Sequence, residues 1–409
     1  MNTIRFIMTA ILFSSISQFC NSIDKKMSGE LDNAEELNMV DETHNNVAPV
    51  SSEPSVRDIC DTINSETDSS STSGQQPMME DIKELPDTMT IAMCGDIMMG
   101  TTFPEVELPA NDGRDLFKDT KPITQRADLA VGNLEGALCD DGKSRKGSGP
   151  NTYSFRTPTN YAVNLSDAGY DFLSVANNHS LDFGEHGMDM TEQSLKGQDI
   201  SYAGVKGRSE YAIVERNGVK YGICAFGHNP YTVMHTNLTT VKRILDTLRP
   251  QCDILVVSFH GGAEGADQNH LPEGTETFLG ENRGNLREFT HFCIDNGADV
   301  IYGHGPHVTR CMEVYKNKFI VYSLGNFCTP YGMSLIGIKG YAPVVEIKID
   351  RNGDFISGQI HSFIQKKGIG PLKDSTNSVA KEMKSLSESD IKNPQITIST
   401  NGEIRRISK

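Results

Sequence analysis

The sequence predicts an α/β fold with mixed sheets, and three observations support this class. From Met89 onward, short apolar runs rich in β-forming residues alternate with longer segments of helical pattern. Two Asn-Gly pairs, at 217–218 and 352–353, each stand between β-type runs, which is the strongest local signal for a hairpin. The 409 residues suffice for one large or two medium domains and contain no internal repeat. Some strand pairing is therefore antiparallel, and a purely parallel sheet is not expected.

The N-terminal residues 1–21 have the pattern of an export signal. Arg5 precedes a short apolar stretch, 6–13, followed by small residues, whereas a membrane-spanning helix needs about 20 apolar residues. Cleavage after Ser17 competes with lipidation of Cys20, and the bulky Phe19 argues against lipidation. The pattern predicts an exported protein, periplasmic or at the cell surface, with a lipid anchor at Cys20 as an alternative.

Residues 22–87 form a polar tract, including "SETDSSSTSGQQP", whose composition predicts a disordered linker. Residues 1–87 contain 16 Asp and Glu against 5 Lys and Arg, a net −11 of the −16 carried by the whole chain. The remainder is only mildly acidic. It has no basic stripe of the kind that binds nucleic acid and no charge run suited to an anionic membrane.

A single domain is expected over residues 88–365. Its strands are expected at 89–94, 128–132, 171–176, 253–259, 299–303 and 319–324, and its helices at roughly 158–169, 185–197, 239–249 and 284–296. Residues 366–409 are expected to form a C-terminal extension with a third hairpin at 396–408. The nine cysteines include no Cys-x-x-Cys pair, which favours buried free thiols, although export would permit some disulfide pairing.

Polar residues follow each of the six predicted strands directly. In chain order these clusters are Asp96; Asn133 with Glu135; Asn177, Asn178 and His179 with Asp182; His260 with Glu264; His304 with His307; and Asn326. Carboxyl ends of strands in an α/β sheet meet at one crevice, which is where such folds bind ligands. We therefore expect these side chains to converge.

The residue types in these clusters suit a transition metal. Carboxylate, amide oxygen and imidazole together favour Mn²⁺, Fe or Zn²⁺ over Ca²⁺ or Mg²⁺, and a structural zinc site is disfavoured because no cysteine takes part. Pro306 argues against a helix at "GHGPHV", so His304 and His307 are expected on a stiff turn. A divalent ion bound there would lower the pKa of a coordinated water and supply a nucleophile near neutral pH.

The same motifs resemble those of a known family. The series "GDIMMG", "NLEG", "ANNHSLDFGEHG", "SFHGGAE", "GHGPHV" and "YSLGNF" is similar to the CapA-type capsule-biosynthesis proteins, over roughly residues 89–365. That family is associated with poly-γ-glutamate synthesis and has a calcineurin-like metallophosphoesterase fold. The resemblance implies a four-layer α/β/β/α sandwich of metallophosphatase type with mixed sheets. "NNHSLDFG" also resembles the "GNHEFDxG" motif of 5′-nucleotidases in the same superfamily.

The resemblance implies roles for single residues. The implied metal ligands, for one or two divalent ions, are Asp96, Glu135, Asn178, His260, His304 and His307. His179 would be the catalytic histidine, which protonates the leaving group or stabilises charge, and Asp182 would orient it. Asn133, Asn177, Glu264 and Asn326 would contact the substrate or support the ligands.

Two departures from the superfamily pattern put the second metal in doubt. The usual Asp-x-His reads Asp96-Ile97-Met98, so one imidazole is missing, and Asn133 stands where an Asp is usual. In addition, Gly261 and Gly305 replace a Trp and a His found in many family members, which puts a lined substrate wall in doubt.

Each cluster also has an ordinary structural interpretation when taken alone. His304 and His307 could be hydrogen-bonded loop histidines, and Asp96 could cap the next segment. The remaining histidines have no comparable context and are expected to be surface or satisfied core residues: His186, His228, His235, His270, His291 and His361.

Three functions remain open from the sequence. The first is making, exporting or trimming an anionic polymer such as poly-γ-glutamate, within a membrane capsule-synthesis complex. The second is metal-dependent hydrolysis of a phosphate mono- or diester. The third is polymer binding without turnover. The residues alone do not choose between ester and amide, since both reactions need the same activated water.

Overall fold

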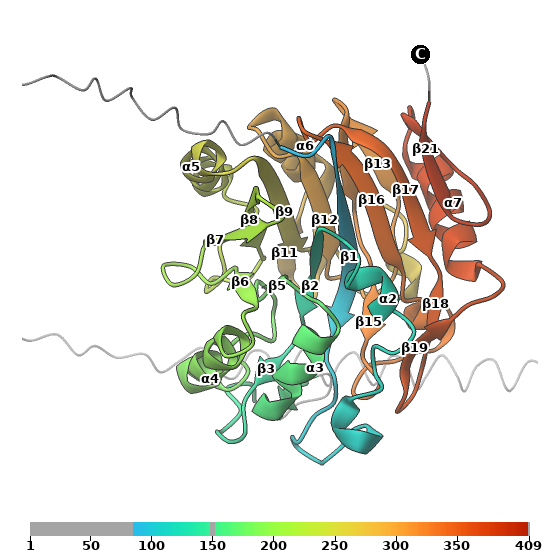
Figure 1. Cartoon of the computed structure of the whole chain (residues 1–409). Coiled ribbons are helices and arrows are strands. Elements are labelled where there is room, and N and C mark those ends of the chain that lie inside the picture. Colours follow the sequence, from blue (N-terminus) through green and yellow to red (C-terminus); the bar gives the residue numbers. More distant parts are fainter. Residues whose placement is uncertain (1–84, 148–151, 408–409) are drawn as a thin grey trace, which may run out of the picture. The chain divides into compact units, whose positions relative to one another are not determined.

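The computed structural model describes residues 85–147 and 152–407, so the predicted export signal, Cys20 and the linker up to residue 84 lie outside the described residues. In this part, two mixed sheets face each other (Figure 1). The larger has nine strands in the order β20-β21-β17-β16-β1-β2-β5-β6, with β15 pairing the end of β1. Their bounds are β1 Thr88–Ile97, β2 Leu129–Leu134, β5 Phe172–Ser174, β6 Ser201–Ala203, β15 Asn326–Cys328, β16 Val344–Asp350, β17 Phe355–His361, β20 Ile396–Ile398 and β21 Glu403–Arg406.

The smaller sheet has the order β13-β14-β12-β9-β8-β7. Its strands are β7 Tyr211–Arg216, β8 Val219–Phe226, β9 Ile254–His260, β12 Val300–His304, β13 Met312–Tyr315 and β14 Lys318–Val321. β8, β9, β12 and β14 are parallel, whereas β7 and β13 are antiparallel edge strands. The predicted mixture of parallel and antiparallel pairing is confirmed.

Helices cover the outer faces of both sheets, except α7, whose Val379, Ala380 and Met383 join the core between the sheets. The helices are α2 Lys121–Thr124, α3 Ala162–Asp167, α4 Gly184–Lys196, α5 Leu238–Leu248, α6 Leu286–Asp295 and α7 Ser378–Asp390. Three short strand pairs complete the described elements: β3 Ala137–Leu138 with β4 Arg156–Thr157, β10 Glu276–Phe278 with β11 Glu281–Gly284, and β18 Phe363–Lys366 with β19 Gly370–Lys373.

The core shows why the strands read as continuous apolar runs. Along β1, Ile91 and Met93 join the core between the sheets, while Ala92 and Cys94 join the core beneath α3 and α4. Successive side chains of a strand point to opposite faces, so a strand covered on both faces needs apolar residues throughout. A third core joins the outer face of the smaller sheet to α5 and α6. Four layers result, helix, sheet, sheet and helix, and the predicted α/β/β/α sandwich is confirmed.

Most predicted elements form close to their expected bounds. Both Asn-Gly hairpins are present as β7–β8 and β16–β17, and β20–β21 form an antiparallel pair that continues the larger sheet through β17. The helix expected at 158–169 is shorter, since a 3₁₀ turn at Thr159–Tyr161 precedes α3 and Gly169 follows it with φ +85°. Asn237 and Asn285 cap α5 and α6, each accepting a main-chain N–H.

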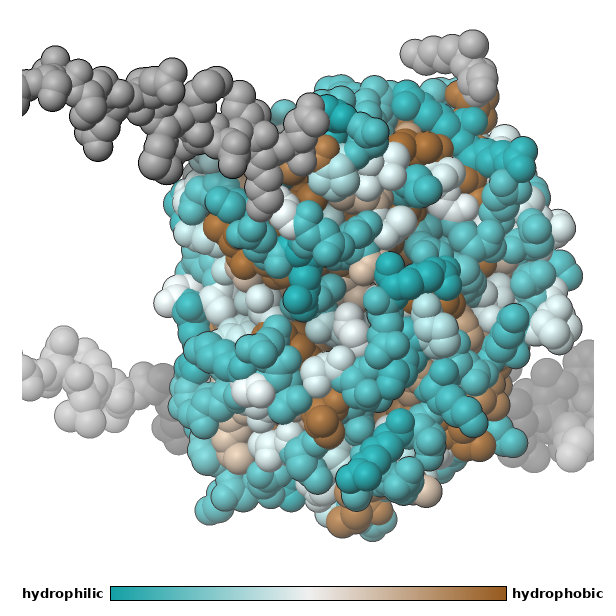
Figure 2. Space-filling view, in the orientation of Figure 1, coloured by the Kyte–Doolittle hydropathy of each residue, from teal (hydrophilic) through white to brown (hydrophobic). Residues whose placement is uncertain are grey.

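The surface shown in Figure 2 is largely hydrophilic, with hydrophobic side chains scattered over it. Among the described residues, no helix is both long and apolar enough to cross a membrane. The seven cysteines of the described ranges are all free; six are buried and Cys252 is half-buried. The expectation of buried free thiols therefore holds for this part of the chain.

Candidate metal centre

Two buried carboxylates lie at the carboxyl ends of adjacent parallel strands of the larger sheet. Asp96 lies in β1 and Glu135 directly follows β2, and neither side chain reaches solvent. The amide of Asn133 joins them, because its Nδ2 donates to Asp96 Oδ1 at 2.9 Å and to Glu135 Oε2 at 2.6 Å. Asn177 Nδ2 in turn donates to Asn133 Oδ1 at 3.0 Å. Four of the predicted residues thus form one buried network.

Three imidazoles approach the carboxylates from the smaller sheet. His260 and His304 occupy paired positions at the ends of the parallel strands β9 and β12. His260 Nε2 lies 3.3 Å from Glu135 Oε2, and His304 Nδ1 lies 3.3 Å from Asp96 Oδ1. His307 Nδ1 lies 3.0 Å from Asp96 Oδ2. The predicted convergence of carboxylates and imidazoles is present in the structure.

These contacts decide the charges of the cluster. Burial alone raises the pKa of Asp96, but hydrogen bonds with His304 and His307 hold that pKa well below its usual range. Burial is likewise outweighed at Glu135, where the neighbouring charge of His260 lowers the pKa to about 2. Burial disfavours a charged His307, yet the hydrogen bond with Asp96 raises its pKa to about 9. With these contacts made, both acids are ionised and His307 is protonated at neutral pH.

The turn that presents His307 is strained. Gly305 has φ +115°, and a Cβ added there would lie 2.5 Å from Gly261 O. His307 has φ +57°, a left-handed conformation that costs a side-chain-bearing residue of order 1–3 kcal/mol. The turn is non-helical, as Pro306 predicts, and it directs His307 back onto Asp96. Strain of this kind persists where the surrounding structure holds it and tends to mark functional sites.

The fit of this cluster to a metal ion has two sides. Within residues 85–147 and 152–407, no three or more His, Cys, Asp and Glu side chains are arranged so that they could hold a metal ion. The carboxylates contact the imidazoles directly instead. Several buried polar atoms nonetheless lack any hydrogen-bond partner: Glu135 Oε1, Asn178 Oδ1, His260 Nδ1 and His304 Nε2. Each such atom costs about 1–3 kcal/mol, and oxygen and imidazole nitrogen are ligands that Mn, Fe and Zn accept. The donor chemistry therefore fits a divalent ion.

The predicted pair of His179 and Asp182 is formed beside this cluster. His179 Nδ1 lies 2.8 Å from Asp182 Oδ2, which also accepts the main-chain N–H of Phe155 at 2.8 Å. The Phe155 ring centroid lies 4.4 Å from that of His179. Because Nδ1 faces Asp182, Nε2 is the ring nitrogen of His179 left for a substrate.

Lys146 joins this pair, and no sequence signal indicated it. Its Nζ lies 2.8 Å from Asp182 Oδ1 and 3.0 Å from His179 Nδ1. Lys146 stands in the loop between β3 and β4, where neither periodicity nor a motif marks a functional residue.

Three predicted residues are held less closely. No hydrogen bond joins Asn178 to another predicted ligand, although it adjoins His179 in the chain. Asn326 pairs with Asp96 through the main chain, but its Nδ2 donates to Lys339 O at 3.2 Å. Glu264 Oε1 accepts from Arg283 at 2.9 Å, and its Oε2 lies 3.8 Å from His307 Nε2.

The expectation of surface or satisfied core residues is wrong for two of the other histidines, His228 and His235. Both are buried, and His228 Nε2 and both ring nitrogens of His235 lack a hydrogen-bond partner. His228 is only 5% exposed, and its ring lies 5.6 Å from that of His260 in a stacked arrangement. Burial, together with the charges of His260 and Arg283, lowers the pKa of His228 to about 2. His228 follows the buried strand β8, so the rule applied to the other strands would have found it.

A cleft of about 590 Å³ adjoins His179 and is called the Lys146 cleft below. Its lining consists of Thr101, Phe103, Pro104, Glu105, Glu107, Ser144, Lys146, Gly147, Thr152, Tyr153, Ser154, Phe155 and Gly332. Lys146 and Phe155 both line the cleft and contact His179, so the cleft lies next to the pair of His179 and Asp182.

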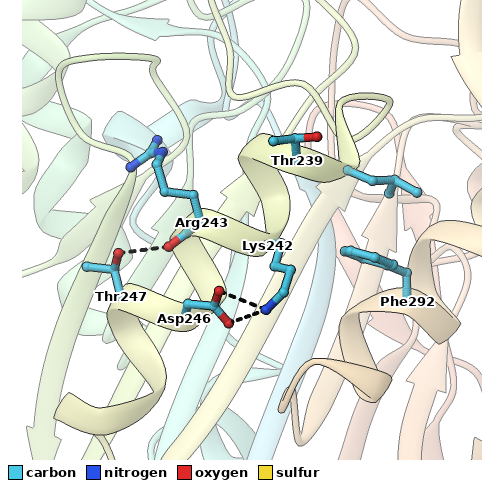
Figure 3. A pocket seen from close by; sticks show the side chains of 7 residues that line it. Thr239, Lys242, Arg243, Asp246, Thr247 and Phe292 are labelled. Carbon is cyan, nitrogen blue, oxygen red and sulfur yellow. Dashed lines mark hydrogen bonds and ion pairs between the residues drawn. The ribbon is translucent and has the colours of Figure 1, made fainter.

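A second pocket, of about 650 Å³, lies along α5 beside Phe292 of α6 (Figure 3). Lys242 Nζ pairs with Asp246 of the same helix at 2.7 Å, whereas Arg243 pairs with Glu210, outside the helix, at 2.7 Å. No predicted site residue lines this pocket.

Comparisons with known proteins agree with the motifs. Residues 90–331 match the profile of the family described as "Bacterial capsule synthesis protein PGA_cap". The chain is 30% identical over 265 residues to the capsule biosynthesis protein CapA of Bacillus anthracis, a match covering 60% of this chain and 60% of that protein. It is 26% identical over 262 residues to the PGA biosynthesis protein CapA of Bacillus subtilis (strain 168), covering 60% of this chain and 64% of that protein. The matches thus span less than two thirds of the length of these relatives. Among solved structures, the 5′-nucleotidase precursor of Thermus thermophilus aligns with a TM-score of 0.39 at 14% identity, covering 69% of this chain and 56% of that one.

Proposed function

This chain belongs to the family of bacterial capsule synthesis proteins, PGA_cap, and from that membership we propose that it helps to make, export or trim an anionic capsule-like polymer such as poly-γ-glutamate. In this proposal the polymer or its precursor is the substrate, and other proteins of a membrane capsule-synthesis complex are partners. Nucleic acid is not a partner. The protein acts after export, in the periplasm or at the cell surface, with lipidation of Cys20 as one means of anchoring it.

The proposed active site is a metal-dependent hydrolase-like centre. The residues that would hold one or two divalent ions, Mn, Fe or Zn, are Asp96, Glu135, Asn178, His260, His304 and His307. Such an ion, when bound, makes a water molecule a competent nucleophile near neutral pH. The observation that carries this proposal is the meeting of ionised carboxylates and imidazoles from both sheets at one place, where all of them but the partly exposed His307 are buried.

The remaining residues donate a proton to the leaving group or hold other side chains of the site in position. Asp182 fixes the His179 ring through Nδ1, so that a proton on Nε2 can pass to the leaving group. Phe155 packs against that ring and excludes water from one of its faces. Asn133 keeps the two carboxylates at fixed positions by donating to both of them.

Two other functions are each favoured by one observation. The His179–Asp182 pair equally suits hydrolysis of a phosphate mono- or diester, in which the histidine protonates the leaving oxygen. Polymer binding without turnover is favoured by the direct contacts between carboxylates and imidazoles, which leave no arrangement of three ligands among the described residues.

Metal content tests the centre first. Elemental analysis of the purified full chain should show a divalent transition metal, and H260A should lower its stoichiometry. H270A is the matched control, because His270 is exposed and pairs only with Asp390 at the surface. An unchanged metal content in H260A would remove His260 from the ligands.

Activity then separates the functions. Release of p-nitroaniline from γ-glutamyl-p-nitroanilide would favour amide hydrolysis, and release of p-nitrophenol from p-nitrophenyl phosphate would favour the phosphoesterase. Either activity should require a divalent ion, Mn, Fe or Zn, and be abolished in H179A but not in H186A, whose histidine is exposed. Bound metal with neither activity would leave the binding function.

A further inference from the structure

The geometry of the Lys146 cleft points to an anion-binding subsite, and we propose that Lys146 binds one carboxylate or phosphate group of the substrate next to the bond that is broken. This inference rests on the proposed hydrolase function and narrows its substrate class. It concerns a residue and a cleft that lie outside the predicted metal ligands.

The position of Lys146 is the first argument. Its ammonium group has three donors and lies beside Asp182 Oδ1 and His179 Nδ1, at 2.8 and 3.0 Å. Because His179 Nδ1 donates its proton to Asp182, it accepts none from Lys146, so only Asp182 Oδ1 accepts from the ammonium and two donors stay free. The side chain is 29% exposed where it lines the cleft. A positive charge is thus presented within reach of the group that His179 would protonate.

The walls of the cleft are the second argument. Tyr153 and Phe155 stack with ring centroids 6.5 Å apart and planes 16° apart, and the Phe155 ring contacts that of His179 at a tilt of 35°. Tyr153 is 56% exposed, so the row of rings runs from solvent to the catalytic pair. Such faces suit the apolar stem of a substrate whose anion lies at Lys146.

The other charges of the cleft limit how many anions it accepts. Glu105 and Glu107 also line it, and among the described residues only Glu107 has a nearby cation, Lys367 at 3.9 Å. A run of anionic groups passing through would meet these carboxylates and be repelled. The cleft therefore suits the end of a polymer chain, or a small precursor, with a single negative charge beside the reacting bond.

Equilibrium binding tests the subsite without any turnover. Isothermal titration calorimetry on the full chain would measure the affinity for glutarate, for its neutral diamide glutaramide and for inorganic phosphate, each with and without EDTA. We expect glutarate or phosphate to bind about tenfold more weakly to K146M than to wild type, as loss of one charge-assisted hydrogen bond implies. The tighter of the two probes identifies the anion as carboxylate or phosphate.

Matched variants define the alternatives. K146R keeps the positive charge and should bind the anion more tightly than K146M does, although its guanidinium differs in shape from an ammonium. K143M should leave the affinity unchanged, because Lys143 is an exposed lysine of the same loop that does not line the cleft. Equal affinity of wild type and K146M, or failure of wild type to bind either anion, would overturn the proposal. If K146M does not fold, equal affinity of wild type for glutarate and glutaramide does the same.

The experiments distinguish failure of the Lys146 subsite from failure of the hydrolase proposal. Anion binding through Lys146 by a protein that holds no metal and hydrolyses neither chromogenic substrate would refute the hydrolase and leave the subsite. Hydrolysis that K146M does not impair in KM, together with unchanged glutarate and phosphate binding, would refute the subsite and leave the hydrolase.

Discussion

The substitution N133D tests how much the Asn133 amide, placed between two buried carboxylates, contributes to the stability of the protein. The Asn133 amide donates to Asp96 and Glu135, and both of these acids are ionised. The exchange removes both hydrogen bonds and adds a third negative charge at the same place. Each hydrogen bond to a charged group is worth about 1.5–3 kcal/mol, so the metal-free protein should lose at least about 3 kcal/mol. At roughly 2–4 °C per kcal/mol for a domain of 150–250 residues, and somewhat less for this larger one, Tm should fall by roughly 4 °C or more.

Thermal unfolding followed by circular dichroism at pH 8 in EDTA would measure this loss. Added Mn²⁺ should raise the Tm of N133D more than that of wild type, because the new carboxylate is a further oxygen ligand. N393D is the control, since Asn393 is exposed and remote from the cluster in the chain. A Tm of N133D in EDTA within 1 °C of wild type would contradict the assignment of Asn133 as the donor that holds the two acids together.

Three further predictions concern the turn, an ion pair and the linker. G305A should lower Tm by several degrees and reduce metal content, because its Cβ would meet Gly261 O at 2.5 Å; G207A, at an open position with nothing within 4 Å, should have a much smaller effect on Tm and none on metal content. Burial raises the pKa of Glu346, but its contacts with His361 and Arg126 lower it by more, from 4.5 to about 2. Its contribution to stability is therefore full above pH 4.5 and lost as the pH falls towards 2, so the Tm difference between wild type and E346Q should be largest near pH 6 and shrink by pH 3; a pH-independent difference would contradict this. Deleting residues 24–84 should leave Tm within 2 °C of wild type, and a large drop would show that this tract packs on the domain.

The sheets were predictable because burial on both faces leaves an unmistakable pattern. Runs such as "DILVVSF" contain almost no polar position, and they form β9 and its neighbours close to the expected bounds. Asn-Gly sets the β7–β8 hairpin through the positive φ of both residues, +50° at Asn217 and +83° at Gly218. The length of α3 was not predictable, because it depends on a 3₁₀ turn that the helical pattern does not reveal.

The carboxylates and imidazoles of the site were predictable because polar side chains at strand ends share one edge of a sheet. We searched for polar residues directly after six predicted strands but not after β8, and His228 was missed for that reason. Lys146 could not be found this way, since its contact with Asp182 is made by a loop whose path depends on tertiary structure. The metal itself stays a prediction, as do the export signal and the division of the chain into domains.

The pairing of Asp96 and Glu135 from one sheet with His260, His304 and His307 from the other has a mechanical consequence. A ligand bound by these side chains together would cross-link the two sheets. If one sheet slid over the other, all of these contacts would break at once. Substitutions in the core between the sheets that change their relative position should therefore lower the affinity for an ion bound by these side chains, even though the substituted residues do not contact the ion. Conversely, an ion bound between the two sheets would oppose their separation, and the free energy of global unfolding would increase when the ion is bound.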